Sequence, residues 1–266
     1  MTKNDLEHLI VTHDSGVMVI TLNRPQSMNT INTTTIRELL QNLNSAKTDD
    51  RVRAVLLRAT GRAFCAGGDM SDQKDADFSQ LSFWVKGFVA SMSEVYLSML
   101  NMQKPVVCAV NGIAAGGGFA LPLASDIVIA SEAAKFSVVF ARTGLGVEAC
   151  VGYLLPRTVG LHKAKELIFF ADTIDASEAD RIGLVNKVVP ADRLDGESLD
   201  VARRLASGPT KALGLSKAIV HRGLDMDLAS SVEMESWCQA LCVQTEDFVE
   251  GRMAFLDKRA PNFKGK

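Results

Sequence analysis

Two glycine-rich stretches have the composition of sites where a ligand touches the main chain. They are AAGGGFA at 114–120 and RAFCAGGD at 62–69. Glycine inside a helix or strand costs about 0.5–1 kcal/mol relative to alanine, so a triplet needs a reason. Without Cβ atoms, backbone N–H groups are open to a phosphate, a carboxylate or a developing oxyanion, above all where a helix begins. The alternative is that these glycines serve close packing or an ordinary turn.

A third stretch, FARTGLGVEAC at 140–150, carries a candidate acid–base group. Glu148 lies between Val147 and Ala149. Apolar surroundings raise the pKa of a carboxyl group toward the value that a general base needs near neutral pH. The alternative is a structural glutamate whose charge is stabilised at a helix N-terminus.

The same stretch also fits G-x-G-x-x-A, the fingerprint of a dinucleotide site. The acidic residue at the required distance is Glu166, but it falls in a helix-like segment, which disfavours this interpretation. The four histidines lie outside the glycine loops, and the motifs of phosphate-binding loops, zinc proteases and serine hydrolases are missing. We therefore expect no metal, and a Ser–His or Cys–His nucleophile is poorly supported.

Composition narrows the class of protein. The 266 residues are 47% hydrophobic with a net charge of −2, which favours a folded α/β protein and argues against nucleic-acid binding. Five cysteines in no dense framework indicate reduced thiols and a cytoplasmic location. No signal-peptide pattern and no run of about 18 apolar residues occurs, so we expect no membrane insertion.

Apolar runs predict the elements that position these loops. Strands are expected at 16–23, 52–59, 105–112 and 126–131, with a shorter one at 184–189. Because the runs are nearly continuous, they predict burial on both faces and a mostly parallel sheet. The glycine loops would then leave the carboxyl ends of strands 52–59 and 105–112, where α/β sheets bind ligands.

Helical periodicity predicts one helix capped by Thr33 or Thr34, another at 85–102 and a mostly helical second half. The helix-like segments of that half are 162–170, 177–184, 197–207, 210–223, 228–244 and 247–260. We divide the chain into an α/β core at 1–200 and a helical region at 201–266 that serves assembly.

Taken together, these segments resemble the enoyl-CoA hydratase/isomerase (crotonase) family. The segments that carry the resemblance appear in the family's order over almost the whole chain: LNRPQSMNT, RAFCAGGD, KPVVCAVNGIAAGGGFALPLASDIVIAS, AKF, GLVNKVV and FLDKRAPNF. The resemblance implies a spiral of β-β-α units with a C-terminal helical trimerisation region. It also implies an oxyanion hole for a coenzyme A thioester, formed by the backbone N–H groups of Gly68 and Gly117.

The resemblance is closest to enoyl-CoA isomerases that use a single carboxylate, here Glu148. Hydratases of the family place two glutamates at positions that are Ala120 and Phe140 in this chain. The implied activity is Δ3,Δ2-enoyl-CoA isomerisation, or a related epoxide isomerisation, in fatty-acid or aromatic-acid breakdown. Pro122 departs from the pattern, because it removes an N–H from the helix that the glycine triplet should start.

The resemblance also assigns substrate contacts. The 62–68 loop would meet coenzyme A through its backbone, Arg24 and Lys258 are candidate phosphate contacts, and Phe255 would flank the ligand. The full set of expected substrate-binding residues is Arg24, Ala63, Cys65, Ala66, Gly67, Phe140, Phe255 and Lys258. We expect the acyl site to draw on 70–100 and on the C-terminal helices. Coenzyme A enters as part of the substrate, so no separate cofactor is implied, and the assembly would be a homotrimer or homohexamer with Lys258 reaching a neighbouring subunit.

Other functions stay open at this point. A hydratase that uses Glu148 with an unrecognised partner is the first alternative. A non-catalytic homologue that binds RNA is another, although the net charge of −2 weighs against it.

Overall fold

The computed structural model describes residues 4–69 and 78–266. The predicted parallel sheet is confirmed as a seven-stranded sheet in the order β1-β2-β3-β4-β6-β8-β11, antiparallel only at its β1–β2–β3 edge. Its strands are β1 (Asn4–Asp5), β2 (Leu9–Asp14), β3 (Val17–Leu22), β4 (Ala54–Ala59), β6 (Val106–Val110), β8 (Ile127–Ser131) and β11 (Lys187–Val189).

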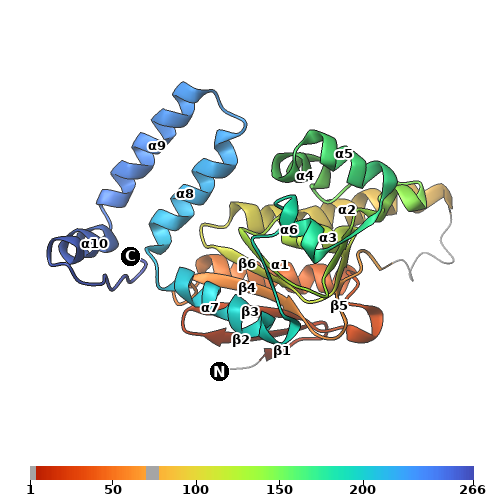
Figure 1. The fold of residues 1–266 in the computed structure, drawn as a ribbon, viewed down its shortest axis with the longest axis horizontal. Coiled ribbons are helices and arrows are strands. Elements are labelled where there is room, and N and C mark those ends of the chain that lie inside the picture. The colour runs from red at the N-terminus through yellow and green to blue at the C-terminus, as the bar shows by residue number, and fades with distance from the viewer. Residues whose placement is uncertain (1–3, 70–77) are drawn as a thin grey trace.

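Both faces are covered in the middle of this sheet, which is why β3 and β6 are buried along their whole length. In β3, Met18 and Ile20 join the main core, whereas Val17 and Val19 pack in a second cluster with α7 (Leu194–Ala206). The main core lies under α1 (Thr33–Thr48) and α2 (Phe78–Asn101), on the opposite side of the sheet from α7 (Figure 1).

A second, four-stranded sheet was not evident from the residues alone. Its order is β10-β9-β7-β5, and the pairs β5–β7 and β7–β9 are parallel. Its strands are β5 (Ala63–Cys65), β7 (Ile113–Ala115), β9 (Lys135–Ser137) and β10 (Thr173–Asp175). A long strand of the first sheet is followed by a short strand of the second in β4–β5, β6–β7 and β8–β9. This repeat gives the β-β-α units that the resemblance implied.

The second half of the chain is helical, as expected. The remaining elements are α3 (Gly117–Leu123), α4 (Val151–Val159), α5 (Leu161–Phe170), α6 (Ala176–Arg181), α8 (Thr210–Gly223), α9 (Leu228–Val243), α10 (Glu246–Leu256) and the 3-10 helices η1 (Pro25–Ser27), η3 (Val139–Thr143) and η4 (Ala191–Arg193). The cap of helix α1 lies earlier than predicted, since neither Thr33 nor Thr34 is the cap. The cap is Asn32, whose side chain accepts a hydrogen bond from the Thr35 amide at 3.0 Å.

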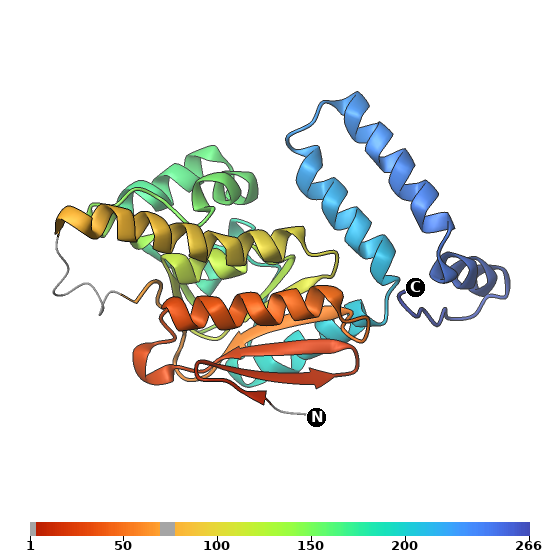
Figure 2. The ribbon, with the colours of Figure 1, turned by 180° about the vertical axis from the view of Figure 1, so that it is seen from behind.

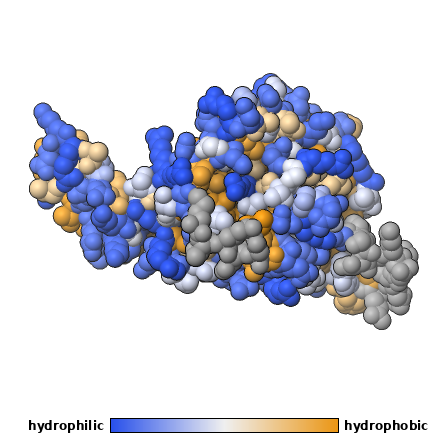
Figure 3. All heavy atoms as spheres, turned by 90° about the horizontal axis from the view of Figure 1, so that it is seen from below, coloured by the Kyte–Doolittle hydropathy of each residue, from blue (hydrophilic) through white to orange (hydrophobic). Residues whose placement is uncertain are grey.

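Helices α8, α9 and α10 project from the core as an arm (Figures 1 and 2). Many apolar side chains of the arm are exposed, among them Leu228 at 81%, Trp237 at 66% and Phe255 at 83%. Figure 3 shows hydrophobic patches on this projecting end. Helix α7 crosses the predicted boundary at residue 200 and packs on the sheet, and the division at that residue stays a prediction.

Candidate active site

The two glycine loops lie side by side, because each follows one strand of the parallel β5–β7 pair. Cys65 pairs with Ala114 in that ladder. A Cβ on Gly67 would lie 2.9 Å from the Ala115 carbonyl oxygen, and one on Gly118 would overlap the Cys65 carbonyl oxygen. The loops therefore touch through their backbones. The loops follow the short strands of the second sheet, not the 52–59 and 105–112 strands that the sequence suggested. The sequence did not reveal these short strands, because three residues are too few to show a periodic pattern.

The loop backbones adopt conformations that favour glycine. Gly67 has φ of +104° and Gly116 has φ of +53°, both in a region that residues with a Cβ rarely occupy. Gly116 precedes α3 as its N-cap, so the Gly117 amide stands at the helix start. Among residues 4–69 and 78–266, no acceptor is found for the amide of Gly68 or of Gly117.

The Gly68 amide is aimed by a short stretch of parallel pairing. The Ile31 amide donates to the Gly67 carbonyl at 2.8 Å, and the Asp69 amide donates to the Ile31 carbonyl at 2.8 Å. Successive N–H groups of an extended chain point to opposite sides. The Gly68 N–H therefore faces away from Ile31.

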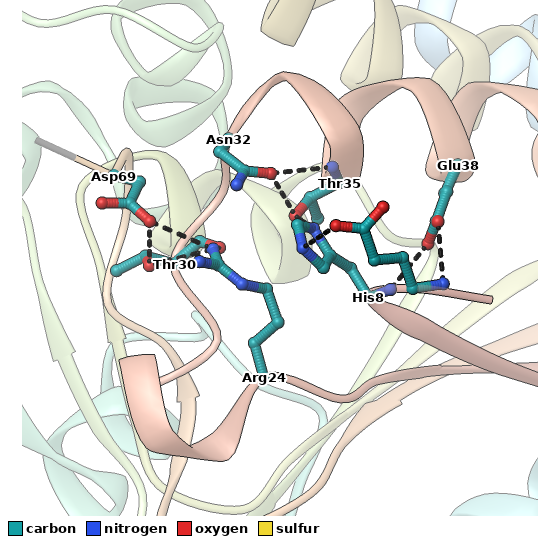
Figure 4. A network of polar contacts seen from close by, with 8 residues as sticks. His8, Arg24, Thr30, Asn32, Thr35, Glu38 and Asp69 are labelled. Carbon is teal, nitrogen blue, oxygen red and sulfur yellow. Dashed lines mark hydrogen bonds and ion pairs between the residues drawn. The ribbon is translucent and has the colours of Figure 1, made fainter. Parts of the chain in front are cut away.

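Side chains on both segments strengthen this pairing (Figure 4). Arg24 Nη1 lies 3.1 Å from Asp69 Oδ2 and 2.8 Å from the Thr30 carbonyl oxygen. The Thr30 hydroxyl donates to the same carboxylate oxygen at 3.1 Å. The side chains of Arg24 and Asp69 are only 16% and 12% exposed, so this ion pair is poorly screened by solvent. Arg24 thus holds the residue next to Gly68. Its predicted contact with a phosphate stays a prediction.

A buried polar group fixes α1, which follows this segment. Glu38, 5% exposed, accepts the amides of Glu7 and His8 at 3.0 Å each. The His8 ring bonds the Thr35 hydroxyl at 2.9 Å, and burial lowers the pKa of His8 (Figure 4). The two residues just before β2 are thereby held against helix α1.

Gly117 is fixed from the side of α2. Tyr96 is fully buried, and its hydroxyl donates to the Gly117 carbonyl at 2.8 Å. A Cβ on Gly117 would lie 2.9 Å from Met92 Sδ, so glycine fits here and alanine is crowded. Burial, followed by the nearby Cys65 and the charge of Glu148, raises the pKa of Tyr96, which stays a protonated donor.

Pro122 lies in α3, one residue before the helix ends at Leu123. The proline removes the N–H that would bond the Gly118 carbonyl in the second turn. The amides at the helix start are untouched. The proline therefore costs the helix one hydrogen bond without removing the Gly117 donor.

Glu148 is half-buried beside these groups. Burial raises the pKa of its carboxyl group above the usual 4.5. Its negative charge contributes to the raised pKa of Tyr96, the residue whose hydroxyl donates to the Gly117 carbonyl. The next two residues, Ala149 and Cys150, have φ of +57° and +62°, and consecutive left-handed residues of this kind store strain. Within the described part of the chain, no hydrogen bond or ion pair engages the Glu148 carboxylate.

The other expected residues divide into two groups. Ala63 and Cys65 are buried in β5 and expose no side chain, and burial raises the pKa of the Cys65 thiol to about 12. The Ala66 amide is already bonded to the Met28 carbonyl at 3.1 Å. Phe140 is 6% exposed, and its ring lies near Gly116. Contact of these residues with a ligand stays a prediction.

Phe255 and Lys258 lie at the end of the arm, far from the glycine loops of the same chain (Figures 1 and 2). Both side chains are exposed. One chain does not bring them to the site. The expectation that they act from a neighbouring subunit stays a prediction.

Part of the expected acyl site, residues 70–77, lies outside the described residues. From 78 onward, α2 supplies contacts that sequence reasoning missed. A Cβ on Gly68 would lie 3.3 Å from Phe88 Cε1, and Phe88 stacks on Trp84. The available signal was the four-residue spacing of large side chains in the predicted 85–102 helix.

Other chemistries find no support in the described residues. Residues 4–69 and 78–266 contain no group of three or more His, Cys, Asp or Glu side chains that could hold a metal ion. In the same residues, no helix is both long and apolar enough to span a bilayer. The G-x-G-x-x-A stretch follows the 3-10 helix η3, where a dinucleotide site needs a strand.

Comparison with known proteins agrees with the resemblance seen in the sequence. The sequence profile of the enoyl-CoA hydratase/isomerase family matches residues 12–266. The 1,2-epoxyphenylacetyl-CoA isomerase of Escherichia coli is 36% identical over 98% of this chain and 100% of its own. The short-chain-enoyl-CoA hydratase of Clostridium acetobutylicum is also 36% identical, over 96% of this chain and 97% of its own.

Solved structures agree with the predicted fold. An enoyl-CoA hydratase from Bacillus anthracis superposes with a TM-score of 0.93 at 32% identity, over 98% of this chain and 100% of its own. An enoyl-CoA hydratase/isomerase from Cupriavidus metallidurans reaches 0.92 at 33% identity, over 98% of both chains. The crotonase-like spiral is thereby confirmed.

Proposed function

This chain belongs to the enoyl-CoA hydratase/isomerase family, and on that premise we propose that it isomerises enoyl-CoA thioesters, moving the double bond from the 3- to the 2-position. One observation carries the proposal. The Glu148 carboxylate is half-buried, has no hydrogen-bond or ion-pair partner among residues 4–69 and 78–266, and acts through its charge on Tyr96, the residue bonded to Gly117, whereas Ala120 and Phe140 are buried and uncharged. The same parts would serve a related epoxide isomerisation, such as the one named for the Escherichia coli relative.

The amides of Gly68 and Gly117 would bind the thioester oxygen. Their adjacent loops and the absence of an acceptor among the described residues support this role. Negative charge grows on the oxygen when the substrate becomes a dienolate. A preorganised donor of this kind is worth about 2.7–4 kcal/mol in the transition state.

Glu148 would carry the proton. Its carboxylate removes a proton from the carbon next to the thioester carbonyl, and the electron pair moves to the oxygen as the dienolate forms. The carboxylic acid then returns that proton to the γ carbon, the 2,3 double bond forms, and Glu148 is a carboxylate again. Burial raises the pKa of Glu148, which suits a group that must both accept and donate a proton.

Hydration of a double bond requires a second acid–base group, which the proposed site lacks. Water must be held, deprotonated and added, which two carboxylates do together in the family's hydratases. Ala120 is fully buried in α3 and Phe140 is 6% exposed in η3, and neither can hold water. Hydratase activity is kept as the second candidate, because relatives of equal identity bear that name.

One experiment separates the two activities. A 3-enoyl-CoA and a 2-enoyl-CoA are each incubated with the protein in ¹⁸O-labelled water, and the products are identified by mass and NMR. We expect the 2-enoyl-CoA from the first substrate and no label in either product. Labelled 3-hydroxyacyl-CoA would support the hydratase, and an absence of both reactions would reject the whole proposal. Glu148→Gln should reduce isomerisation by about 10²–10⁴-fold.

We further propose that the chain assembles as a homotrimer or homohexamer. The arm exposes large apolar side chains that a second copy would cover: Val220, Leu224, Leu228, Trp237, Val249, Phe255 and Leu256. Phe255 and Lys258 would reach a site of that copy. Sedimentation analysis tests this, because a monomer at micromolar concentration would contradict it.

A further inference from the structure

Helix α2 presents one continuous face to both glycine loops. Trp84, Phe88, Met92 and Tyr96 are spaced by four residues and so share a side of the helix. A Cβ on Gly117 would lie 2.9 Å from Met92 Sδ and 3.2 Å from Tyr96 Oη. Phe88 lies four residues before Met92 on the same helix, and its Cε1 atom would lie 3.3 Å from a Cβ on Gly68. The face therefore runs from the buried Gly117 contact past Gly68 and outward to Trp84.

The outer part of this face is aromatic. The rings of Trp84 and Phe88 stack with their centroids 5.2 Å apart and their planes 7° from parallel. Phe88 packs against the main core on its inner side, whereas Trp84 is 40% exposed. The indole thus extends an aromatic surface that begins at the Gly68 backbone.

We infer that Trp84 and Phe88 line the acyl site and select thioesters whose acyl group carries an aromatic ring. The inference rests on the proposed function for one point, the thioester oxygen at the Gly68 amide. From there the acyl carbons pass Phe88, and a ring a few bonds further along meets the Trp84 face. Aromatic rings stack on such a surface in offset geometry, whereas a saturated ring or a linear chain gains only apolar contact.

Binding of substrate analogues tests the inference without any reaction. The probes are the saturated thioesters 5-phenylpentanoyl-CoA, 5-cyclohexylpentanoyl-CoA and undecanoyl-CoA, which have equal numbers of acyl carbons. We expect the phenyl thioester to bind about two- to tenfold more tightly than the cyclohexyl one. Trp84→Leu and Phe88→Leu should bring the phenyl-to-cyclohexyl affinity ratio close to one. Trp84→Phe should keep most of the preference because an aromatic ring remains.

Phe83→Leu is the matched control. Phe83 is the same kind of residue on the same helix, but it is 79% exposed and one residue off the aromatic face. A phenyl-to-cyclohexyl ratio near one in the unchanged protein would overturn the inference. So would a ratio that Trp84→Leu leaves unchanged, or that Phe83→Leu lowers equally. Thermal unfolding of each variant identifies any that fails to fold.

Fluorescence offers a second readout. The chain has two tryptophans, so Trp237→Phe on the arm leaves Trp84 as the reporter. The phenyl thioester should shift or quench this emission more than the linear one, and equal responses would contradict the contact.

Ring preference in binding without isomerisation would reject the proposed function alone. Isomerisation of 3-enoyl thioesters without ring preference would reject this inference alone.

Discussion

At the scale of single residues, the proposed chemistry depends on a carboxylate that is costly to keep charged. Burial raises the pKa of Glu148 above 4.5, so the folded state favours its protonated form. The stability linked to this group is present below its ordinary pKa and is lost as pH rises through the folded value. Activity has the opposite dependence, because proton removal from the substrate needs the carboxylate.

Glu148→Gln should therefore stabilise the protein while it removes activity. The gain in thermal stability over the unchanged protein should be larger at about pH 8, where Glu148 is ionised, than at about pH 5. Differential scanning calorimetry at the two pH values measures this. An equal gain at both would show that Glu148 has the same pKa in the folded and unfolded states.

Arg24 has two competing roles that kinetics can separate. If it positions the Gly68 loop through Asp69, Arg24→Gln and Asp69→Asn should both lower kcat by about tenfold with little change in KM, because the Gly68 donor is misaimed. If Arg24 binds a phosphate, Arg24→Gln should raise KM and Asp69→Asn should not. Arg51→Gln is the control, since Arg51 forms an ion pair with Asp49 at an exposed surface.

At the scale of elements, the contact between α3 and β5 determines whether the two loops meet. A Cβ on Gly118 would overlap the Cys65 carbonyl oxygen, whereas Gly196 in α7 has no atom within 4 Å of such a Cβ. Gly118→Ala should lower the free energy of unfolding by several kcal/mol and abolish activity. Gly196→Ala should raise it by about 1 kcal/mol through helix propensity alone. Chemical denaturation compares the two, and similar effects would contradict the packing.

The elements also show how far sequence reasoning reaches. Long strands such as β3 and long helices such as α8 follow from runs and periods that span many residues. Strands β5, β7 and β9 have three residues each, too few for a pattern, so the second sheet came only from the family resemblance. The residue type of Glu148 suggested a base, but its influence on Tyr96 depends on α3 packing against both α2 and α4, which no local pattern encodes.

At the scale of the whole molecule, the arm depends on its own C-terminal tail. Asp247 at the start of α10 is 4% exposed and accepts the amides of Lys264 at 2.6 Å and Gly265 at 2.8 Å. Arg53, at the base of β4, donates to the Phe263 carbonyl at 3.0 Å. The tail therefore ties α10 to the core.

Asp247→Ala should loosen this tie. Two amides lose a charged acceptor, which costs about 1.5–3 kcal/mol, so amide hydrogen exchange should accelerate at Lys264, at Gly265 and along α10. The exposed Asp257, at the other end of α10, supplies Asp257→Ala as the control. Unchanged exchange in α10 of the Asp247 variant would mean that the tail does not restrain the arm.

The close packing around Ala120 limits the routes by which this site could change. Its methyl group is enclosed on all sides, and the phenyl ring at 140 fills its own niche. Placing a glutamate at either position would put a charge where neither space nor water awaits it. Under the proposed function, an engineer who wished to install a pair of acids would first have to hollow out the surroundings, so a second proton carrier cannot be added here by a single substitution.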